Sequence, residues 1–446
     1  MLRNHPRGLM VLFFTEMWER FGFYTLMAIL YLYMEESLGW GDKRKGDYYG
    51  YFLAMVYFVP MLGGFLGDRV LGQRNTIRLG AILMVFGYVA LTFSSLPRIA
   101  LFDAGLVLVG VGTGLFKANI SVLVGNLYEE GSKFKDAAFN IFYMGVNLGA
   151  TLAPLAATFI SLRYHSYNLS FAAAAVGMVI SMVVFQVWGR HVVPAHIDGP
   201  KPAVAGGLAL PAASRSEDWQ RITSLLTLFV IVAFFWVAFY QNGSSLTLFA
   251  KRSTYEWLKP ETYQVFNPFF ILALTPVLVA VFARLREKGL EPSSAAKIFA
   301  GMVAMGLSML IMVFASLAGG DRDEAIMSPA WLISSYFVVT VSEILVSPMG
   351  LSFVSKVAPQ RMRGLMMGGW FAATAFGGFS SGWLGKYYGP FTHDALVGST
   401  DRVLRWVGQY CNRFDHHDFF LVIAALPFIS ALLVLPFLKR LNRFSR

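Results

Sequence analysis

Long apolar runs repeated along the whole chain constrain this sequence more than any other feature. Each run is about 18–30 residues long, enough for an α-helix to cross the ~30 Å hydrocarbon core of a bilayer. The twelve runs begin near Leu9, Tyr49, Thr76, Leu101, Ala137, Asn168, Ile222, Thr262, Ala295, Met327, Met362 and Asp418. Because a helix satisfies its own backbone hydrogen bonds in lipid, the pattern predicts an all-α polytopic membrane protein with twelve transmembrane helices.

The composition and the placement of charge agree with this prediction. The chain is 56% hydrophobic and only 14% charged, more apolar than a soluble protein of this length could bury. Its net charge of +11 reflects Lys and Arg, which are commoner in the inner loops if the N-terminus is placed in the cytoplasm. We therefore predict a multi-pass protein of the plasma membrane or bacterial inner membrane, with both termini cytoplasmic and no nucleic-acid partner.

Few residues could support catalysis or cofactor binding. Cys411 is the one cysteine, so an internal disulfide is excluded, and the Cys and His residues form no metal-binding cluster. The sequence has no glycine-rich nucleotide loop and no nucleophile–base set within the spans. We expect no metal, no other cofactor and no enzymatic activity. The first apolar run is too long for a signal peptide and lacks a small-residue cleavage site, so we expect it to be a retained span.

A polar segment separates the twelve runs into two groups of six. Residues 191–220 are rich in Pro, Ala and Gly and are typical of a flexible cytoplasmic linker. We predict an N-terminal six-helix bundle over residues 1–190 and a C-terminal six-helix bundle over residues 221–446. This plan, together with a glycine-rich motif at Gly63–Gly72, resembles the major facilitator superfamily, in which two halves rock about a central site. Residues 386–417 are expected to form a solvated outer loop.

Three charged residues interrupt the first apolar run: Glu16, Glu19 and Arg20. An ionisable group at the centre of a bilayer costs at least ~2.5–3.5 kcal/mol on insertion scales, so such groups are seldom kept without a function. At 100° per residue, the three charges share one helix face with Tyr24 and Met27. We expect this face to line a bundle interior or a water-filled cavity, which indicates that the protein moves or senses a polar solute.

Four motifs in the two halves resemble signatures of the proton-dependent oligopeptide transporter family. The first is Glu16–Phe21, which contains all three charges of the first span. The others are Gly114–Asn119 in the fourth span, Phe142–Gly149 in the fifth and Ser342–Pro348 in the tenth. The resemblance implies a symporter that imports di- and tripeptides by alternating access and is driven by protons.

The chemistry of a zwitterionic peptide suggests which residues bind it. Glu343 is a suitable anion for the ammonium, with Asn147 and Asn267 as neutral partners, and Lys117 and Arg20 are suitable cations for the carboxylate. Further candidates for contact with the peptide are Tyr24, Tyr57, Tyr143, Trp236, Phe239, Ser347 and Trp370. Structural roles stay open: the lysine could only neutralise a glutamate, the amides could join helices, the aromatics could pack, and Ser347 could bond back to its own helix.

Carboxylates, not histidines, are expected to couple transport to protons. All seven histidines fall in loops, at the termini or at span ends, and Gly50 stands at the position that resembles the second-span histidine of animal relatives. We hypothesise that Glu16 or Glu19 takes up the proton when Lys117 turns to the peptide carboxylate, with Arg20 completing the coupling group.

The sequence departs from the family where a pair of charges would be expected. Family members usually have a basic residue at the position of Met27 and an acid at that of Tyr240, and the resemblance implies that the two pair as an outer gate. Since both charges are missing here, no unpaired intramembrane charge remains. We expect an outer gate that depends on packing and hydrogen bonds.

Other functions stay open from the sequence alone. The same fold could carry nitrate or another small anion or metabolite, and a transport-inactive chain could sense peptides. The expected partners are di- and tripeptides, protons and the lipid bilayer. The sequence does not fix the oligomeric state, although a monomer would suffice for transport.

Overall fold

The computed structural model describes residues 5–128, 135–192, 215–359 and 363–435. These fall into two compact units. The first comprises Met1–Gly39 with Phe52–Ala212, and the second comprises Trp40–Tyr51 with Ala213–Arg446. The boundary near residue 212 falls in the predicted linker, of which residues 193–214 lie outside the described residues. The predicted division into bundles therefore stays a prediction.

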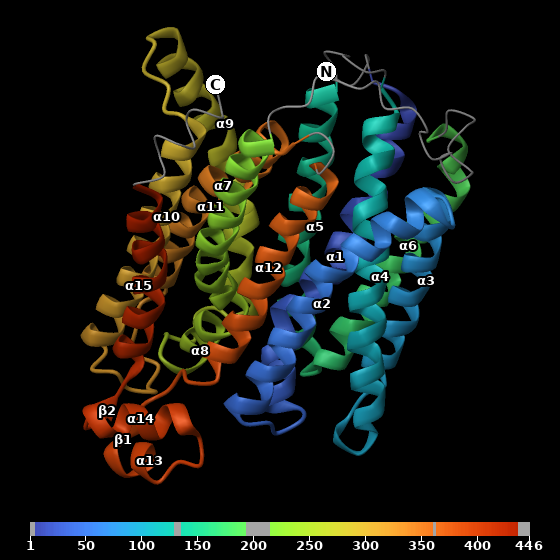
Figure 1. Ribbon diagram of the computed structural model, residues 1–446. Helices are drawn as coiled ribbons and strands as arrows, with labels where there is room; N and C mark the ends of the chain where they lie inside the picture. The colour runs from blue at the N-terminus through green and yellow to red at the C-terminus, as the bar shows by residue number, and fades with distance from the viewer. Residues whose placement is uncertain (1–4, 129–134, 193–214, 360–362, 436–446) are drawn as a thin grey trace. The chain divides into compact units, whose positions relative to one another are not determined.

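The first unit is built from long helices that pack side by side (Figure 1). Within it α1 packs against α5 and α6, and α3 packs against α4 and α6. Its helices are α1 (Arg7–Glu36), most of α2 (Asp42–Arg69), α3 (Gln73–Thr92), η2 (Leu96–Arg98), α4 (Ile99–Asn126), α5 (Lys135–Tyr164), α6 (Tyr167–Trp188) and η3 (Gly189–His191).

In the second unit α10 packs against α11 and α15, while α7 packs against α12 and α15. Its helices are α7 (Arg215–Phe239), η4 (Tyr240–Gly243), α8 (Ser245–Arg252), η5 (Pro260–Val265), α9 (Phe266–Glu287), α10 (Ser294–Ala318), α11 (Pro329–Val357), α12 (Arg363–Gly385), α13 (His393–Val397), α14 (Arg402–Tyr410) and α15 (His416–Val434). Two short strands, β1 (Phe391–Thr392) and β2 (Arg413–Phe414), pair antiparallel.

The prediction of an all-α membrane fold with twelve spans is confirmed. Within the described residues, twelve helices have 19 or more residues, and each corresponds to one predicted apolar run. Ten candidate spans, one of them joining α7 to α8, meet the length and hydropathy required to cross a bilayer. The other two long helices are α1, in which three charges lower the hydropathy, and α12, which is rich in glycine and serine.

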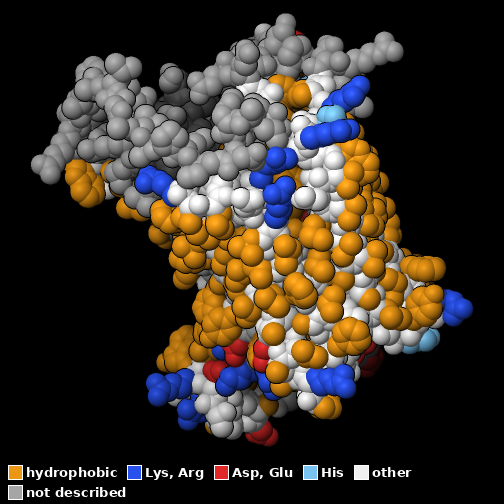
Figure 2. All heavy atoms as spheres, turned by 90° about the vertical axis from the view of Figure 1, so that its right-hand side faces the viewer, with side chains coloured by type: hydrophobic (Ala, Val, Ile, Leu, Met, Phe, Trp, Pro, Cys, Tyr) orange, Lys and Arg blue, Asp and Glu red, His pale blue; other side chains and the backbone are white. Residues whose placement is uncertain are grey.

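Exposed apolar side chains show how this fold meets the membrane. On the face shown in Figure 2, hydrophobic side chains cover a broad middle band, while Lys and Arg gather above and below it. Phe86 on α3, Val107 on α4 and Val176 on α6 are each more than half exposed. A water-soluble surface would not carry so much exposed apolar area, whereas lipid solvates it. The protein is an integral membrane protein.

Helix α2 contributes to both units, and glycine explains its packing in the second. A Cβ on Gly46 would lie 2.4 Å from the carbonyl oxygen of Gly382 in α12, and one on Gly50 would lie 2.7 Å from that of Phe379. The hydroxyl of Tyr49 donates to the Tyr240 carbonyl over 3.1 Å. Gly50 thus permits close contact with α12, which a histidine at this position would prevent.

One sequence-based expectation is incomplete. The segment between α12 and α15 is largely exposed, as expected, but it is not an irregular loop, because it contains α13, α14 and the β1–β2 pair. The side chain of Leu396 is fully buried within it, and Gly408 lies so close that an added Cβ would be 2.9 Å from the Cβ of Leu396. These contacts stabilise short elements whose local sequence has no strong periodic signal.

Candidate functional site

The charged face of α1 forms a buried ion-pair cluster. Glu16, Glu19 and Arg20 are 3%, 0% and 2% exposed. The Arg20 guanidinium binds both carboxylate oxygens of Glu19, with Nη2 2.6 Å from Oε1 and Nε bonded to Oε2. Its Nε also lies 3.4 Å from Oε1 of Glu16, one turn earlier. The three charges thus lie together on one face of α1, as predicted, and the Arg20 guanidinium contacts both carboxylates.

The two glutamates of this cluster differ in their hydrogen bonds. Glu19 is held by a two-point contact with Arg20. Glu16 has only the single longer contact, and its buried Oε2 has no hydrogen-bond partner among the described residues. Burial of an unsatisfied polar atom is costly, so Oε2 of Glu16 is the atom in the cluster that gains most from an added proton.

Lys117 of α4 supplies a second cation, besides Arg20, within the spans of the first unit. Its Nζ lies 5.0 Å from the ring centroid of Tyr57 and interacts electrostatically with Arg20, Glu16 and Glu19. No carboxylate of the described residues is within ion-pair distance of it. Two carboxylates and two cations therefore balance in number, but Lys117 keeps its ammonium available to a further anion.

Asn119, the last residue of the fourth-span motif, was not among the predicted site residues, and it fixes the position of this part of α4. Its side-chain amide donates to the carbonyl of Gly63 in α2 over 2.9 Å and to that of Leu115 over 2.8 Å. Gly67 leaves the necessary room, because a Cβ there would overlap the Asn119 side chain. The fourth-span motif and the glycine-rich motif of α2 thus form one contact, which holds the turn that carries Lys117.

Three other predicted site residues of the first unit lie on α1 and α5. Tyr24 is half-buried with its ring edge-on to that of Phe23. Tyr143 is 45% exposed, and the buried Asn147 amide donates over 2.9 Å to its backbone carbonyl. The asparagine thus bonds back to its own helix. A Cβ on Gly149 would lie 2.2 Å from the Met17 carbonyl, so the fifth-span motif allows α1 and α5 to pack closely.

The second unit contains a carboxylate with a neutral partner. Asn267 of α9 donates its amide to Oε2 of Glu343 on α11 over 2.8 Å and lies 3.2 Å from the hydroxyl of Thr340. Among the described residues no cation pairs with Glu343, which is half-buried. Asn267 thus holds one oxygen of Glu343, and the carboxylate can still accept hydrogen bonds from a cation. Ser347 lies half-buried one turn further along α11.

Aromatic residues of α7 form a stacked group near its end. The Trp236 ring stacks on that of Tyr240 at 5.6 Å between centroids, and that of Phe239 meets it edge-on at 5.2 Å. The indole Nε1 of Trp236 is buried with no hydrogen-bond partner among the described residues. Trp370 on α12 is 2% exposed and packs directly over Gly350 of α11, where any Cβ would overlap its ring. Trp370 therefore has a packing role in this structure.

Hydrogen bonds replace charge next to Tyr240. The fully buried Gln241 donates to the Ser381 hydroxyl over 3.1 Å and accepts from those of Ser244 at 3.2 Å and Ser245 at 2.7 Å. Tyr240 itself is 6% exposed. In the second unit, the surroundings of Tyr240 are thus packed and hydrogen-bonded. Whether they act as a gate stays a prediction.

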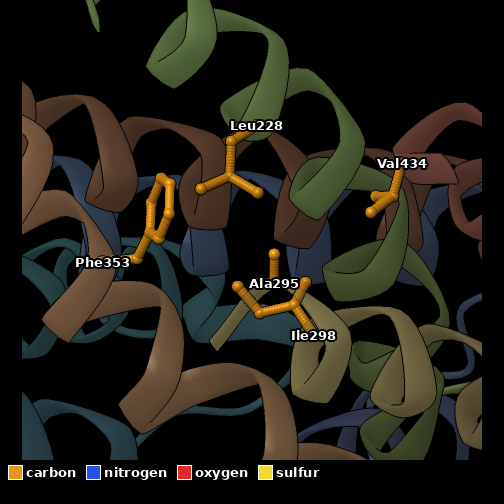
Figure 3. Close-up of a pocket in the computed structure, with 5 residues that line it drawn as sticks. All are labelled: Leu228, Ala295, Ile298, Phe353 and Val434. Carbon is orange, nitrogen blue, oxygen red and sulfur yellow. The ribbon is translucent and has the colours of Figure 1, made fainter. Parts of the chain in front are cut away.

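The pocket in Figure 3 is separate from these residues. It lies among α7, α10, α11 and α15, and the side chains that line it are Leu228, Ala295, Ile298, Phe353 and Val434. All five are hydrocarbon side chains, so the pocket offers nothing to a charged solute. None of the predicted site residues lines it.

Comparison with known proteins identifies the family. The family model described as PTR2, POT family, matches residues 74–205 and 203–398. The chain belongs to the POT family. It is 30% identical to peptide transporter YePEPT of Yersinia enterocolitica, over 86% of this chain and 88% of the relative. It is 31% identical to dipeptide and tripeptide permease A of Escherichia coli, over 85% and 84% of the two chains.

Solved structures of POT-family proteins share the fold. A crystal structure of peptide transporter POT with sulfate has a TM-score of 0.86 and 27% identity, covering 100% of this chain and 97% of that one. A structure of a variant of the same transporter with alafosfalin has a TM-score of 0.85. The prediction of a major facilitator fold is confirmed, and the chain belongs to a family of transporters.

Proposed function

We propose that this POT-family protein is a proton-coupled symporter that imports di- and tripeptides by alternating access. The observation that carries the proposal is one intramembrane charge in each unit without an ion-pair partner among the described residues. These are the carboxylate of Glu343 and the ammonium of Lys117. Intramembrane charges are costly unless a ligand or partner compensates them. A zwitterionic peptide offers the complementary charge to both.

Glu343 is the proposed partner of the peptide ammonium. Asn267 holds one carboxylate oxygen, which orients the group and leaves the other oxygen for the ligand. A neutral amide partner is suited to this task, because a basic residue there would compete with the ammonium. Charge-assisted hydrogen bonds are about twice as strong as neutral ones, so this contact would dominate recognition of the amino end.

Lys117 is the proposed partner of the peptide carboxylate, while Arg20 maintains the buried cluster. The Arg20 guanidinium already serves two glutamates. Both Arg20 and Lys117 are suitable cations for the carboxylate, and the contacts of Arg20 with the glutamates support Lys117 as the direct ligand. When it moves to the peptide, its electrostatic interaction with Glu16 and Glu19 weakens, and a proton on Glu16 would restore the balance of charge.

The aromatic candidates would contact peptide side chains. Tyr57 already lies beside Lys117, and the Tyr143 side chain is 45% exposed. Trp236 offers a buried indole N–H that a peptide carbonyl could accept. Because such surfaces adapt to many shapes while the charged ends are held firmly, the protein would accept varied side chains.

The topology belongs to the same proposal. Both termini are placed in the cytoplasm, in a plasma or bacterial inner membrane, and a monomer suffices. The exposed Cys411, the only cysteine of the chain, then lies outside. A membrane-impermeant maleimide should label intact cells at Cys411, and a Cys411→Ser, Lys288→Cys variant should be labelled only after permeabilisation. The reverse pattern would invert the topology.

The decisive experiment is uptake of labelled dialanine by proteoliposomes, with and without an inward proton gradient. Each charge that crosses the membrane is worth ~2.3 kcal/mol per 100 mV, so a gradient should drive accumulation. Glu343→Gln should lose accumulation, whereas Glu291→Gln, on the loop between α9 and α10, should keep it. Well-folded protein that accumulates nitrate but no peptide would favour the other-solute function. Binding of peptide without counterflow would favour a sensor.

A further inference from the structure

The folded segment between α12 and α15 contains a helix with an unusual surface. Since α12 and α15 both cross the membrane, residues 386–415 lie at one membrane surface, at the end of these helices (Figure 1). The strand pair, with Phe391 opposite Phe414, holds the two ends of the segment together. Tyr387, which follows α12, lies 3.4 Å from Asp401, and Asp401 caps α14 by accepting from the Val403 amide over 2.8 Å. Helix α14 is therefore fixed at this surface.

One side of α14 packs inward. Leu404 and Val407 are half-buried and Gly408 is buried, in contact with α13. At 100° per residue these three positions occupy one face of the helix. Two further stripes are left on its outer side.

The two outer stripes lie next to one another and differ in chemistry. The aromatic stripe consists of Val403, Trp406 and Tyr410, which are 37%, 61% and 74% exposed. The cationic stripe consists of the exposed residues Arg402, Arg405 and Gln409. A helix with a large apolar stripe beside a basic one is the pattern of helices that lie in the membrane interface.

A second exposed aromatic pair lies at the same end of this unit. Tyr255 and Trp257, in the segment between α8 and η5, are 42% and 77% exposed, and their rings stack at 5.6 Å. Backbone hydrogen bonds join this segment to Met327, before α11. The nearby Asp321 in turn accepts from the backbone and ring of His417, at the start of α15. Trp and Tyr are enriched at membrane–water interfaces, so two such pairs at one end indicate the depth of the headgroups.

We propose that α14 binds the bilayer surface as an interfacial helix, with its aromatic stripe at the boundary between headgroups and acyl chains. Its cationic stripe binds the phosphate groups of anionic phospholipids. The charge of the stripe and the obligatory presence of lipid at this surface favour a bilayer over a protein partner. This inference depends on the chain being a membrane protein and not on its cargo, so the two proposals can fail separately.

Spin labels on the full-length protein can test the orientation of α14. Val403→Cys and Gln409→Cys, each in a Cys411→Ser background, place one label on each stripe of the same helix. In vesicles containing phosphatidylglycerol, the label at position 403 should collide mainly with oxygen, and that at position 409 mainly with a water-soluble nickel chelate. Equal access of the chelate to both labels would overturn the proposal, as would protection of position 403 from both reagents, which indicates protein contact.

A second experiment tests whether the charge of the lipid matters. Arg402→Gln with Arg405→Gln should increase access of the nickel chelate to position 403 several-fold in anionic vesicles. In vesicles of phosphatidylcholine alone the change should be smaller, and Arg402→Lys with Arg405→Lys should restore the parent result. An effect of the same size in both lipids would overturn the role of anionic phospholipids. Unchanged size-exclusion profiles and unfolding temperatures of these variants in detergent would show that they are folded.

Discussion

The intramembrane charges of the two units are arranged differently. In the first unit, Arg20 binds both carboxylate oxygens of Glu19 and lies close to Glu16, so most of the charge is compensated within the helix itself. In the second unit, Glu343 has only the amide of Asn267, and no cation among the described residues. We infer that the paired charges of the first unit stabilise the protein, whereas the carboxylate of Glu343 is available to a ligand or a proton.

This difference has an energetic basis. A buried ion pair gains little over apolar residues, but removal of one partner strands the other and costs ~3–5 kcal/mol. A carboxylate without a partner has already incurred its desolvation cost in the folded protein, so its neutralisation should not destabilise the fold. We therefore expect substitutions in the first unit to lower stability, and neutralisation of Glu343 to affect binding and transport instead.

The largest effect is expected for Arg20→Leu. This change leaves Glu16 and Glu19 buried side by side without a cation and should cost ~3–5 kcal/mol of stability. Thermal unfolding in detergent should show a clear drop for Arg20→Leu, and no drop for Glu343→Gln. Arg286→Leu, which removes a 71%-exposed arginine from an ion pair, is the matched control. If Glu343→Gln destabilises as much as Arg20→Leu, the comparison between the units is wrong.

The next prediction distinguishes the roles of Glu16 and Glu19 on α1. Glu19→Gln loses the two-point ionic contact with Arg20 and should cost ~1.5–3 kcal/mol of stability. Glu16→Gln should leave stability nearly unchanged and abolish gradient-driven accumulation of dialanine while counterflow persists, because Oε2 of Glu16 is the atom without a partner.

Thermal unfolding and paired uptake and counterflow assays distinguish the two variants. Their folded fractions can be compared by size-exclusion profiles before transport is scored. Intact accumulation by Glu16→Gln together with loss in Glu19→Gln would assign the proton to Glu19. If a variant with both Glu16→Gln and Glu19→Gln still accumulates dialanine, neither glutamate takes part in proton coupling.

Much of the fold and of the charged face of α1 can be predicted from the sequence, because these features depend on residues that are close together in the chain. Hydropathy over about twenty residues predicts a span whatever the rest of the chain does, so the twelve helices are predictable. The common face of Glu16, Glu19 and Arg20 needs only the helical period. Even α2 is predictable as a helix, although it begins at Asp42, seven residues before the apolar run that predicts it.

The remainder depends on contacts between distant residues. Asn119 can hold α4 only because Gly63 and Gly67 of α2 lie against it. Asn147 could have bonded to a neighbouring helix as well as to its own, and sequence does not decide between them. Helix α14 is nine residues long, too short to be stable without its packing on α13. A motif identifies the residues, but tertiary contact decides what each of them does.

A smaller effect is expected at Lys117, which is half-buried. Lys117→Gln should weaken dialanine binding about tenfold, the loss of one charge-assisted hydrogen bond of ~1.5 kcal/mol. Dialanine amide, which has no carboxylate, should bind the variant and the parent protein almost equally. Competition against a labelled peptide measures both ligands, and an equal loss for both would mean that Lys117 acts on the cluster around Arg20 instead.

The smallest effect is expected for Glu291 and its partners Arg286 and Lys297, which lie outside the hydrophobic core of the membrane. This group is the exposed counterpart of the ion-pair cluster on α1. Glu291, before α10, accepts from Arg286 Nε and from Lys297 Nζ at 2.5 and 2.7 Å. These hydrogen bonds, first that of Arg286 and then that of Lys297, lower the pKa of Glu291 from 4.5 to about 2. Stabilisation by an ionised carboxylate with a lowered pKa is complete above pH 4.5 and is lost as the pH falls towards 2.

Glu291→Gln should therefore differ slightly from the parent protein in unfolding temperature at pH 7, and the difference should shrink between pH 4.5 and pH 3. Raised salt should shrink it as well, because solvent and ions screen the exposed pair with Arg286. The unfolding temperature of Glu19→Gln relative to the parent should respond far less to salt, since its partner Arg20 is buried. Equal salt sensitivity at both sites would mean that water reaches the α1 cluster in the folded protein, and the distinction between a compensated interior and a screened surface would have to be abandoned.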